Sequence, residues 1–453
     1  MKPVLIITPY FAPQTHAAVF RAYKLAKYLP RYGYKPYVIT SDINYLYNED
    51  YTLLSDLPDE VEIIPTRYIE PTLRGLRMAF GGVDRTFVKT KAHTDYTNEK
   101  GKNSGDTLEK ESHLKKRLIS RGYVWCTENL LEWPDRYWTW SAGAIKKAEE
   151  LIDKHKIKVV YTTVVPYTCL KIGQHLKQKK DIQWVADFRD PCGYGERYNS
   201  PQWQRRWLEQ SYTRKTMEKA DVVTGLAHSY GSIFFDYYGL DESKYTFIPT
   251  GVDDDYLTDL TKSESIDKKY LLFVGEFLPE YGDHFFSALN RARVKGLIKG
   301  EFDLKFVGRK ELNQPRVTAL LKDKAELLSH CIFIDHLSQK ELYKTMINAH
   351  ACLLLPGLSR LWWCNFAKMV DYIALGKPVI ASVPETSEAR TELSKAGIGI
   401  FLSGHPDDDC NLLAEVINSS TATANPTDYC QRYLASSQVS SFANIFDHLL
   451  KNS

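Results

Sequence analysis

A chain of 453 residues is too long for one ordinary hydrophobic core, and its length therefore predicts two domains. Hydrophobic residues make up 43% and charged residues 25%, as in globular proteins, and a net charge of +3 gives no reason to expect a nucleic acid as partner. The eight cysteines include no Cys-x-x-Cys pair, so neither a zinc site nor a disulfide framework is predicted and a cytoplasmic location is expected. No apolar stretch reaches the roughly 18 residues of a membrane helix.

The first forty residues predict a strand, a loop, a helix and a second strand. The apolar run at 4–8 is typical of a buried parallel strand, 18–29 has helical periodicity, and 37–40 is again of strand type. Ligands of open parallel sheets bind beyond the carboxyl ends of the strands, so the loop with Thr15 and His16 is expected to face a cleft. Because this loop lacks a G-x-G-x-x-G pattern, no nicotinamide or flavin cofactor is expected.

Residues 68–130 interrupt the regular alternation of strands and helices. The segment 89–113 is polar and nearly without apolar residues, which predicts a mobile insertion. Basic and apolar segments flank it at 73–80 and 113–125. Such segments suit peripheral contact of 73–125 with an anionic membrane, at the inner face of the cell membrane, and an ordinary helix edge with solvated charges is the alternative.

Charged residues gather after a strand in the middle of the chain. Strands are predicted at 158–163 and 183–186, and Asp187, Arg189 and Asp190 directly follow the second. Two carboxylates and a guanidinium at a strand end are costly to bury unless they are paired or used. We expect a structural ion pair between Arg189 and Asp187, and a cleft-facing Asp190.

The strand pattern restarts with an apolar run that ends at Gly275. Further strands alternate with helices to residue 382, and one of these helices is predicted over 316–328. The sequence thus predicts an α/β protein with a first domain over 1–244, a second over 245–430, and a terminal helix over 431–453 that packs back on the first domain. The acidic triplets Asp253–Asp255 and Asp407–Asp409 are read as solvated turn residues, not as metal ligands.

Residues 365–382 form a predicted helix that leads into a buried strand. Lys368 and Asp371 lie three residues apart and are therefore neighbours on the helix surface. A cation and a carboxylate near a helix start can bind a phosphate and a ribose. A solvated ion pair is the alternative.

Several strings of residues resemble the family-four retaining glycosyltransferases of bacterial polysaccharide and glycolipid synthesis. FIPTGVD resembles the family's linker string IPNGVD, and NFAKMVDYIALGKPVIAS resembles its donor-site string KLFEYLALGKPVIAS. The resembling segments are 9–40, 133–140, 164–173, 184–191, 247–253 and 365–382. The resemblance implies the GT-B fold, in which two Rossmann-like doubly wound domains face a cleft.

The same resemblance implies a function and a set of site residues. The protein would move a sugar from a nucleoside-diphosphate sugar, most simply a UDP-sugar, to a hydroxyl of a glycan or lipid-linked acceptor, with retention and without a metal or other cofactor. Lys368 matches a lysine near the donor diphosphate, and Asp371 matches a glutamate on the ribose. The implied donor-binding residues are Thr15, Gly275, Arg309, Lys310, His336, Leu337, Arg360, Phe366, Lys368 and Asp371. The implied acceptor-side residues are Tyr167, Asp187 and Arg189, and the implied catalytic residues are His16 and Asp190.

The chain departs from the family pattern at two loops. Thr15–Ala17 stand where the family has a glycine pair, and Glu276 and Glu280 follow Gly275 where the family carries an arginine and a lysine. Three other functions stay open. The missing basic pair after Gly275 motivates a glycosyltransferase-like assembly partner without turnover. A sugar-nucleotide epimerase on the same fold is the second, although the acceptor-side strings within 133–191 argue against it, and a membrane-associated scaffold that uses 73–125 is the third.

Overall fold

The computed structural model describes residues 1–15, 17–42, 49–72, 75, 133–194, 203–258, 260, 268–278, 283–359, 361–420, 422 and 424–451. The chain divides into two compact units, and each is described by itself. Unit 1 comprises Met1–Leu226, Tyr230–Ile248 and Val439–Ser453, and unit 2 comprises Ala227–Ser229 and Pro249–Gln438. Of the predicted features, His16, Arg360 and, apart from Gly75, the segment 73–125 lie outside the described residues.

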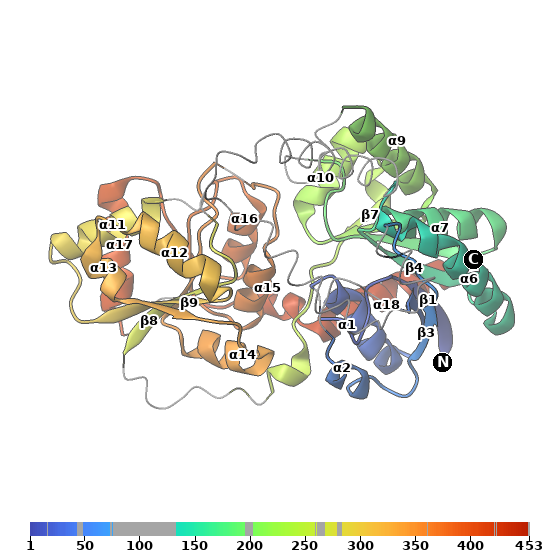
Figure 1. The fold of residues 1–453 in the computed structure, drawn as a ribbon, viewed down its shortest axis with the longest axis horizontal. Coiled ribbons are helices and arrows are strands. Elements are labelled where there is room, and N and C mark those ends of the chain that lie inside the picture. Colours follow the sequence, from blue (N-terminus) through green and yellow to red (C-terminus); the bar gives the residue numbers. More distant parts are fainter. Residues whose placement is uncertain are drawn as a thin grey trace, which may run out of the picture. The chain divides into compact units, whose positions relative to one another are not determined.

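The described strands of unit 1 form a parallel sheet in the order β3-β2-β1-β4-β5-β6-β7. Strands β1, β3, β4 and β7 of this sheet are labelled in Figure 1. The strands are β1 (Lys2–Ile7), β2 (Tyr34–Ser41), β3 (Glu62–Thr66), β4 (Val159–Val164), β5 (Gln183–Phe188), β6 (Val222–Gly225) and β7 (Tyr245–Phe247). The helices are α1 (Val19–Tyr28), η1 (Leu29–Tyr32), α2 (Thr52–Ser55), η3 (Arg136–Trp140), α6 (Ser141–His155), α7 (Tyr167–Lys179), α9 (Trp203–Lys219), the part of α10 (His228–Tyr238) from Tyr230 onward, η4 (Glu242–Lys244) and the part of α18 (Ala435–Lys451) from Val439 onward.

The centre of this sheet is buried on both faces. The run from Val4 to Ile7 in β1 has no exposed side chain, because β2 and β4 flank it and helices cover it. The strand order changes direction between β1 and β4, which is the point where doubly wound folds bind ligands. The loops after these two strands are therefore the part of unit 1 in which a site is expected.

The C-terminal helix α18 packs on unit 1, as the sequence predicts. The ring of Phe442 meets Tyr161 of β4 edge-on at 5.4 Å, and the ring of Phe446 meets Tyr34 of β2 at 5.6 Å. The Nζ atom of Lys2 lies 2.6 Å from a carboxylate oxygen of Asp447. The last helix thus joins the first strand.

The described strands of unit 2 form a second parallel sheet in the order β10-β9-β8-β11-β12-β13. The strands are β8 (Lys269–Val274), β9 (Phe302–Val307), β10 (Cys331–Ile334), β11 (Ala351–Leu354), β12 (Val379–Ala381) and β13 (Gly399–Phe401). The helices are η5 (Asp254–Tyr256), α11 (Asp283–Val294), α12 (Lys310–Leu320), α13 (Ala325–Ser329), α14 (Gln339–Asn348), α15 (Ala367–Ala374), α16 (Glu388–Lys395), α17 (Pro406–Asn418) and η6 (Asp428–Tyr433).

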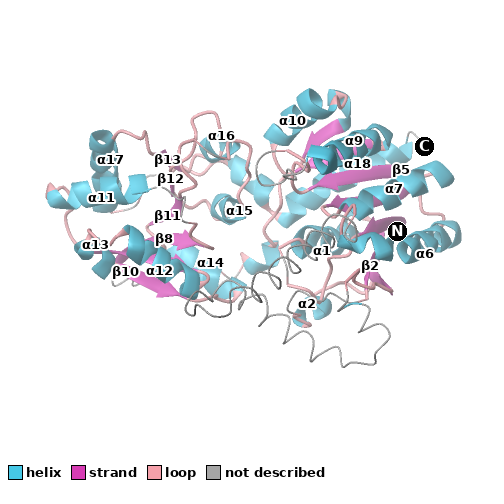
Figure 2. Cartoon of the chain, turned by 45° about the horizontal axis from the view of Figure 1, so that its top comes forward, coloured by secondary structure: helices cyan, strands magenta, loops and turns pink. Residues whose placement is uncertain are grey.

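Side chains of β8 alternate between two cores, one on each face of this sheet. Tyr270 and Leu272 belong to the core that includes Met369 of α15, whereas Leu271 and Phe273 belong to the opposite core. This alternation is the period-two pattern of a strand that is buried on both faces. In Figure 2 the strands of unit 2 accordingly lie between helices.

One predicted helix differs from the structure. A single helix was expected over 316–328, but two helices, α12 and α13, cover 310–329 with a break after Leu320. Pro315 lies inside α12 and does not precede it. The first turn of α12 is held by Asn313, whose side chain bonds the exit of β8, so tertiary contacts fix a helix start that the sequence pattern does not show.

No helix in the described ranges combines the length and the apolar character needed to cross a membrane.

Candidate functional site

Two glycines lie side by side at the carboxyl edge of the unit 2 sheet. Gly275 follows β8 with a φ of +98°, and Gly308 follows β9 with a φ of +149°. A Cβ on Gly308 would lie only 2.6 Å from the carbonyl oxygen of Gly275. Position 308 therefore requires glycine, and the two strand exits are packed backbone to backbone.

Lys368 of α15, which the resemblance implies as a donor-binding residue, reaches this edge. Its Nζ lies 3.7 Å from the centre of the Phe273 ring, and a Cβ built on Gly275 would be 3.9 Å from both Cε and Nζ of the lysine. Burial lowers the pKa of Lys368 to about 7. Phe366 is the half-buried N-cap residue of the same helix. The fold thus brings Gly275 and Lys368 together at one strand exit.

A polar clamp fixes the turn that follows Gly275. The side chain of Asn313, which is fully buried, donates to the carbonyl of Gly275 at 2.9 Å and accepts from the backbone N–H of Phe277 at 2.8 Å. Arg316 donates to the Glu276 carboxylate and to the Phe277 carbonyl, both at 2.8 Å. The sequence reasoning missed these α12 residues. A buried asparagine one turn into a helix that follows a glycine-terminated strand was the available signal.

The carboxylate of Glu276 lies close to two arginines, in the segment where the resembling family has basic residues. Its carboxylate is 2.8 Å from Arg316 and 3.6 Å from Arg309, and the Arg309 side chain is more than half exposed. Lys310, the first residue of α12, is exposed beside it. Two predicted donor-binding residues, Arg309 and Lys310, therefore lie at the exit of β9, and a carboxylate holds one of them.

The predicted ribose and base contacts lie on neighbouring elements of unit 2. Asp371 of α15 accepts a hydrogen bond from the hydroxyl of Tyr343 at 3.2 Å, and Gln339 donates to that hydroxyl at 2.8 Å. Burial and the Asp371 carboxylate raise the pKa of Tyr343. His336 and Leu337 follow β10. The backbone N–H of the exposed His336 donates to Asp335.

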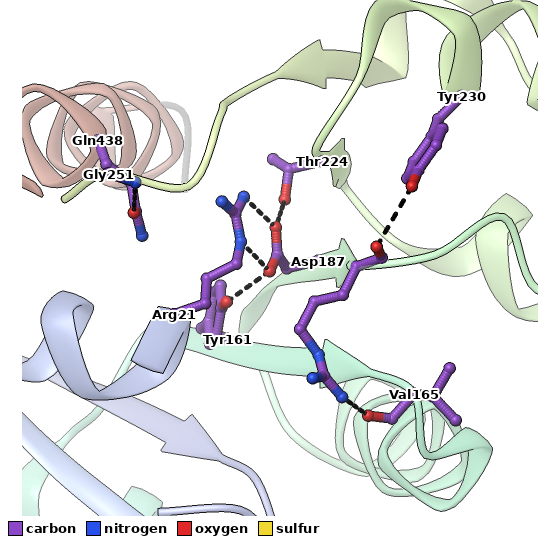
Figure 3. Close-up of polar contacts among 9 residues, drawn as sticks. Arg21, Tyr161, Val165, Asp187, Thr224, Tyr230, Gly251 and Gln438 are labelled. Carbon is purple, nitrogen blue, oxygen red and sulfur yellow. Dashed lines mark hydrogen bonds and ion pairs between the residues drawn. The ribbon is translucent and has the colours of Figure 1, made fainter. Parts of the chain in front are cut away.

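Asp187 of unit 1 is fully buried, and its partner is Arg21 of α1. The Nε and Nη2 atoms of Arg21 bond the two carboxylate oxygens at 2.7 Å each, and the hydroxyls of Tyr161 and Thr224 add bonds of 2.6 Å (Figure 3). The predicted ion pair with Arg189 was wrong, because Asp187 points to the face of the sheet that α1 covers. An arginine on the apolar face of the predicted helix 18–29 was the signal for this pair. Burial and the Asp187 carboxylate raise the pKa of Tyr161.

Arg189 instead points to the exit of the neighbouring strand β4. Its guanidinium donates to the carbonyl of Val165 and lies over the ring of Tyr10, 5.6 Å from the ring centre. The backbone carbonyl of Arg189 accepts a hydrogen bond from the hydroxyl of Tyr230. Within the described part of the chain the buried Nε of Arg189 has no hydrogen-bond partner. Asp190 is half-buried next to it. Tyr10, Val165 and Arg189 come from the exits of β1, β4 and β5, where the strand order of unit 1 changes direction.

The remaining predicted residues of unit 1 lie near the same strand exits. Thr15 is exposed in the loop between β1 and α1. Tyr167 begins α7 and is buried, and its burial raises the pKa of its hydroxyl. Asp135, which was not predicted, bonds the backbone N–H and the hydroxyl of Thr168 at 2.6 and 2.7 Å and so anchors the start of α7. Its place in the WPDRYWTW string was the available signal.

The acidic triplets are not all solvated. Asp407 is exposed and pairs with Arg291 and Lys295, but Asp409 is buried and accepts from the backbone N–H groups of Ser403 and Gly404 at 2.7 and 3.0 Å. The expectation of a solvated residue fails there because Asp409 caps the loop before α17, and it fails at Asp253 as well, which is buried and caps η5 through a bond from the backbone N–H of Asp255. Among the described residues no three His, Cys, Asp or Glu side chains are grouped so as to hold a metal ion.

Residues 113–256 match the family model described as Glycosyltransferase Family 4, in agreement with the resemblance noted above. No curated protein matches the sequence. Solved structures share the fold over the whole chain. A glycosyltransferase from Rickettsia africae ESF-5 has a TM-score of 0.59 at 14% identity, with 100% of this chain and 99% of that chain covered. Sucrose-phosphate synthase from Thermosynechococcus elongatus has 0.58 at 12%, with both chains fully covered.

UDP-GlcNAc 2-epimerase from Methanocaldococcus jannaschii also shares the fold, with a TM-score of 0.54 at 12% identity and coverage of 99% of this chain and 100% of that chain. Likeness at such identities shows the fold alone. The two parallel sheets and these neighbours together confirm the predicted GT-B architecture of two Rossmann-like domains.

Proposed function

We propose, from the GT-B fold and the match to Glycosyltransferase Family 4, that this protein moves a sugar from a nucleoside-diphosphate sugar to a hydroxyl of a glycan or lipid-linked acceptor. The observation that carries the proposal is the position of Lys368. It lies beside Gly275 at the strand exit where the unit 2 sheet changes direction, which is where doubly wound folds bind nucleotides. A UDP-sugar is the donor to test first.

The unit 2 edge has the chemistry that a departing diphosphate needs. Negative charge develops on the diphosphate as the sugar leaves, and Lys368, Arg309 and the N-terminus of α15 can stabilise it. Binding of the anion would raise the pKa of Lys368 from about 7, so that the lysine becomes fully charged in the complex. In this proposal these groups take the place of a metal ion.

The acceptor is assigned to unit 1. Arg189 at the exit of β5 still has a buried donor atom without a partner in the described part, and Asp190 follows it directly. These groups would orient the acceptor hydroxyl. The donor diphosphate would take the proton from that hydroxyl, and the sugar would be transferred with retained configuration and without a protein nucleophile.

A screen of sugar nucleotides tests the proposal. The full-length protein is incubated with UDP-, GDP- and dTDP-sugars, and both thermal stabilisation and release of the nucleoside diphosphate are measured. We expect stabilisation and slow hydrolysis with one nucleotide class, and transfer once a hydroxyl acceptor is supplied. Absence of binding to all three classes would contradict the proposal.

Two other functions make different predictions in the same screen. An assembly partner without turnover is favoured by Glu276, which holds Arg309 and Arg316, and would bind no nucleotide or release no product. One solved structure with this fold is an epimerase. An epimerase would convert the sugar of the nucleotide sugar into its epimer without any acceptor. Analysis of the sugar after incubation without acceptor distinguishes the epimerase from the transferase.

A further inference from the structure

Helix α9 turns large apolar side chains outward and polar side chains inward. Trp203 and Trp207 are 68% and 62% exposed, and Leu208 next to them is exposed as well. The opposite side of the helix buries Thr213 and Thr216 completely. A helix on the surface of a water-soluble domain has the reverse pattern. The outer face of α9 therefore suits surroundings that are less polar than water.

The two tryptophans are held on a firmly attached helix. They are four residues apart and so lie on the same side of α9. Further along the helix, Arg214 donates from Nε to the backbone carbonyl of Tyr238 in α10 at 2.8 Å, and Met217 is buried. Trp203 and Trp207 are thus presented to the outside by a helix that is fixed to unit 1.

Positive charge accompanies the exposed aromatic rings. The carboxylate of Glu209 is buried and bonds the Nε of Arg205 at 2.9 Å, so this charge is compensated within the helix. Arg214, Lys215 and Lys219 are exposed on the outer side, against one exposed carboxylate, Glu218. Over its whole length α9 carries five cations and two carboxylates, which are Arg205, Arg206, Arg214, Lys215 and Lys219 against Glu209 and Glu218.

We propose that the outer face of α9, formed by Trp203, Trp207, Leu208, Lys215 and Lys219, docks the protein on an anionic phospholipid surface. Tryptophan is suited to the boundary between water and lipid, since its ring is apolar and its N–H remains hydrogen-bonded. Lysine side chains next to such rings can lie along the apolar surface and pair with phosphate groups. This face is separate from the segment 73–125 and from the strand exits described above.

A second copy of the chain is a poorer occupant of this face. Two tryptophans at these exposures present on the order of 300 Å² of apolar surface. A stable protein interface needs about 800 Å² from each partner. In addition, lysines on both copies would repel one another across a symmetric contact, whereas an anionic lipid surface attracts them.

Vesicle co-sedimentation of the full-length protein tests the proposal. The vesicles contain either phosphatidylglycerol mixed with phosphatidylcholine or phosphatidylcholine alone. We expect binding to the anionic vesicles, and a weakening of at least about tenfold in both Trp203→Ala/Trp207→Ala and Lys215→Gln/Lys219→Gln. Lys146→Gln/Lys154→Gln, which removes two exposed lysines from α6 of the same unit, is the matched control and should bind as the unchanged protein does. Circular dichroism confirms that each variant is folded.

Three outcomes would overturn the proposal. The first is that the unchanged protein binds neither kind of vesicle, or binds both equally. The second is that both α9 variants bind as strongly as the control, which would assign the lipid contact to another surface such as 73–125. The third is that sedimentation velocity shows a dimer that Trp203→Ala/Trp207→Ala converts to a monomer, which would make the face a contact between copies.

Discussion

The carboxyl edges of the two sheets have the same topology and opposite electrostatics. In unit 1 Asp187 lies near the end of strand β5, and its buried carboxylate accepts hydrogen bonds from Arg21, Tyr161 and Thr224 of the same unit. In unit 2 the strand β8 ends in Gly275, beside which Lys368 has a pKa of about 7. The negative charge of Asp187 is compensated by partners in the same unit, whereas the positive charge of Lys368 becomes more favourable when an anion binds beside it. The difference separates a residue that holds a strand end from one that is suited to bind a ligand.

The largest effect on stability is expected for the buried ion pair of unit 1, between Arg21 and Asp187. Asp187→Ala leaves the Arg21 guanidinium buried without its carboxylate, so we expect the free energy of unfolding to fall by about 3–5 kcal/mol in urea denaturation. Asp181→Asn, which breaks an exposed ion pair with Lys158, is the control and should leave the midpoint unchanged. Equal stability of the two variants would show that Asp187 does not hold the fold.

The next effect concerns donor binding by unit 2. Lys368→Ala removes a cation beside Gly275, and a charge-assisted contact of ~1.5–3 kcal/mol corresponds to a roughly tenfold to hundredfold loss of nucleotide affinity. Isothermal titration with a UDP-sugar measures it. Lys344→Ala, on the exposed side of α14, is the control. Unchanged affinity in Lys368→Ala would remove this residue from the site.

The pH dependence of nucleotide binding is a second test of Lys368. Because the pKa of Lys368 is about 7 in the free protein, the lysine is charged below pH 7 and neutral above it. Affinity for a UDP-sugar, whose diphosphate does not titrate in this range, should therefore fall up to about tenfold between pH 6 and pH 8. Arg stays charged throughout, so Lys368→Arg should bind with little pH dependence. A flat profile for the unchanged protein would contradict the lowered pKa.

The lowered pKa of Lys368 also determines how the free energy of unfolding changes with pH. Between pH 7 and the ordinary pKa of lysine, Lys368 is protonated in the unfolded chain but has lost its proton in the folded protein without ligand. The contribution of Lys368 to the free energy of unfolding therefore increases as the pH rises from 7 toward that value. Urea denaturation of Lys368→Met, compared with the unchanged protein at both ends of this range, should show the increase only in the unchanged protein.

The smallest effect is expected at Glu276. Glu276→Gln keeps the size of the side chain and removes the charge that holds Arg309 and Arg316, so both cations become available to a diphosphate. We expect nucleotide affinity to increase severalfold. A decrease would mean that Glu276 positions the arginines for binding, and absence of binding in both proteins would favour the assembly partner.

The sequence predicted the fold well because its strands have strong local signals. Apolar runs that end at Gly275 and Gly308 predicted buried parallel strands, and both runs are strands of the second sheet. The partner of Asp187 was missed because Arg21 is far away in sequence: its place on an apolar helix face shows that it is buried but does not show with which residue it pairs. The start of α12 was missed for a similar reason, since Asn313 acts through tertiary bonds. Contacts between residues that are far apart in the sequence cannot be predicted from the periodicity of apolar residues.

The contact between Lys2 and Asp447 has a consequence for synthesis of the protein on the ribosome. Strand β1 leaves the ribosome long before Phe442 and Phe446 of α18, which cover its sheet. Pro249–Gln438 is a continuous segment that carries nearly all of unit 2, so this segment can fold as soon as it has emerged. Unit 1 is therefore completed only after the segment that carries unit 2 has been made, and until then Tyr34 and Tyr161 lack their ring contacts with α18.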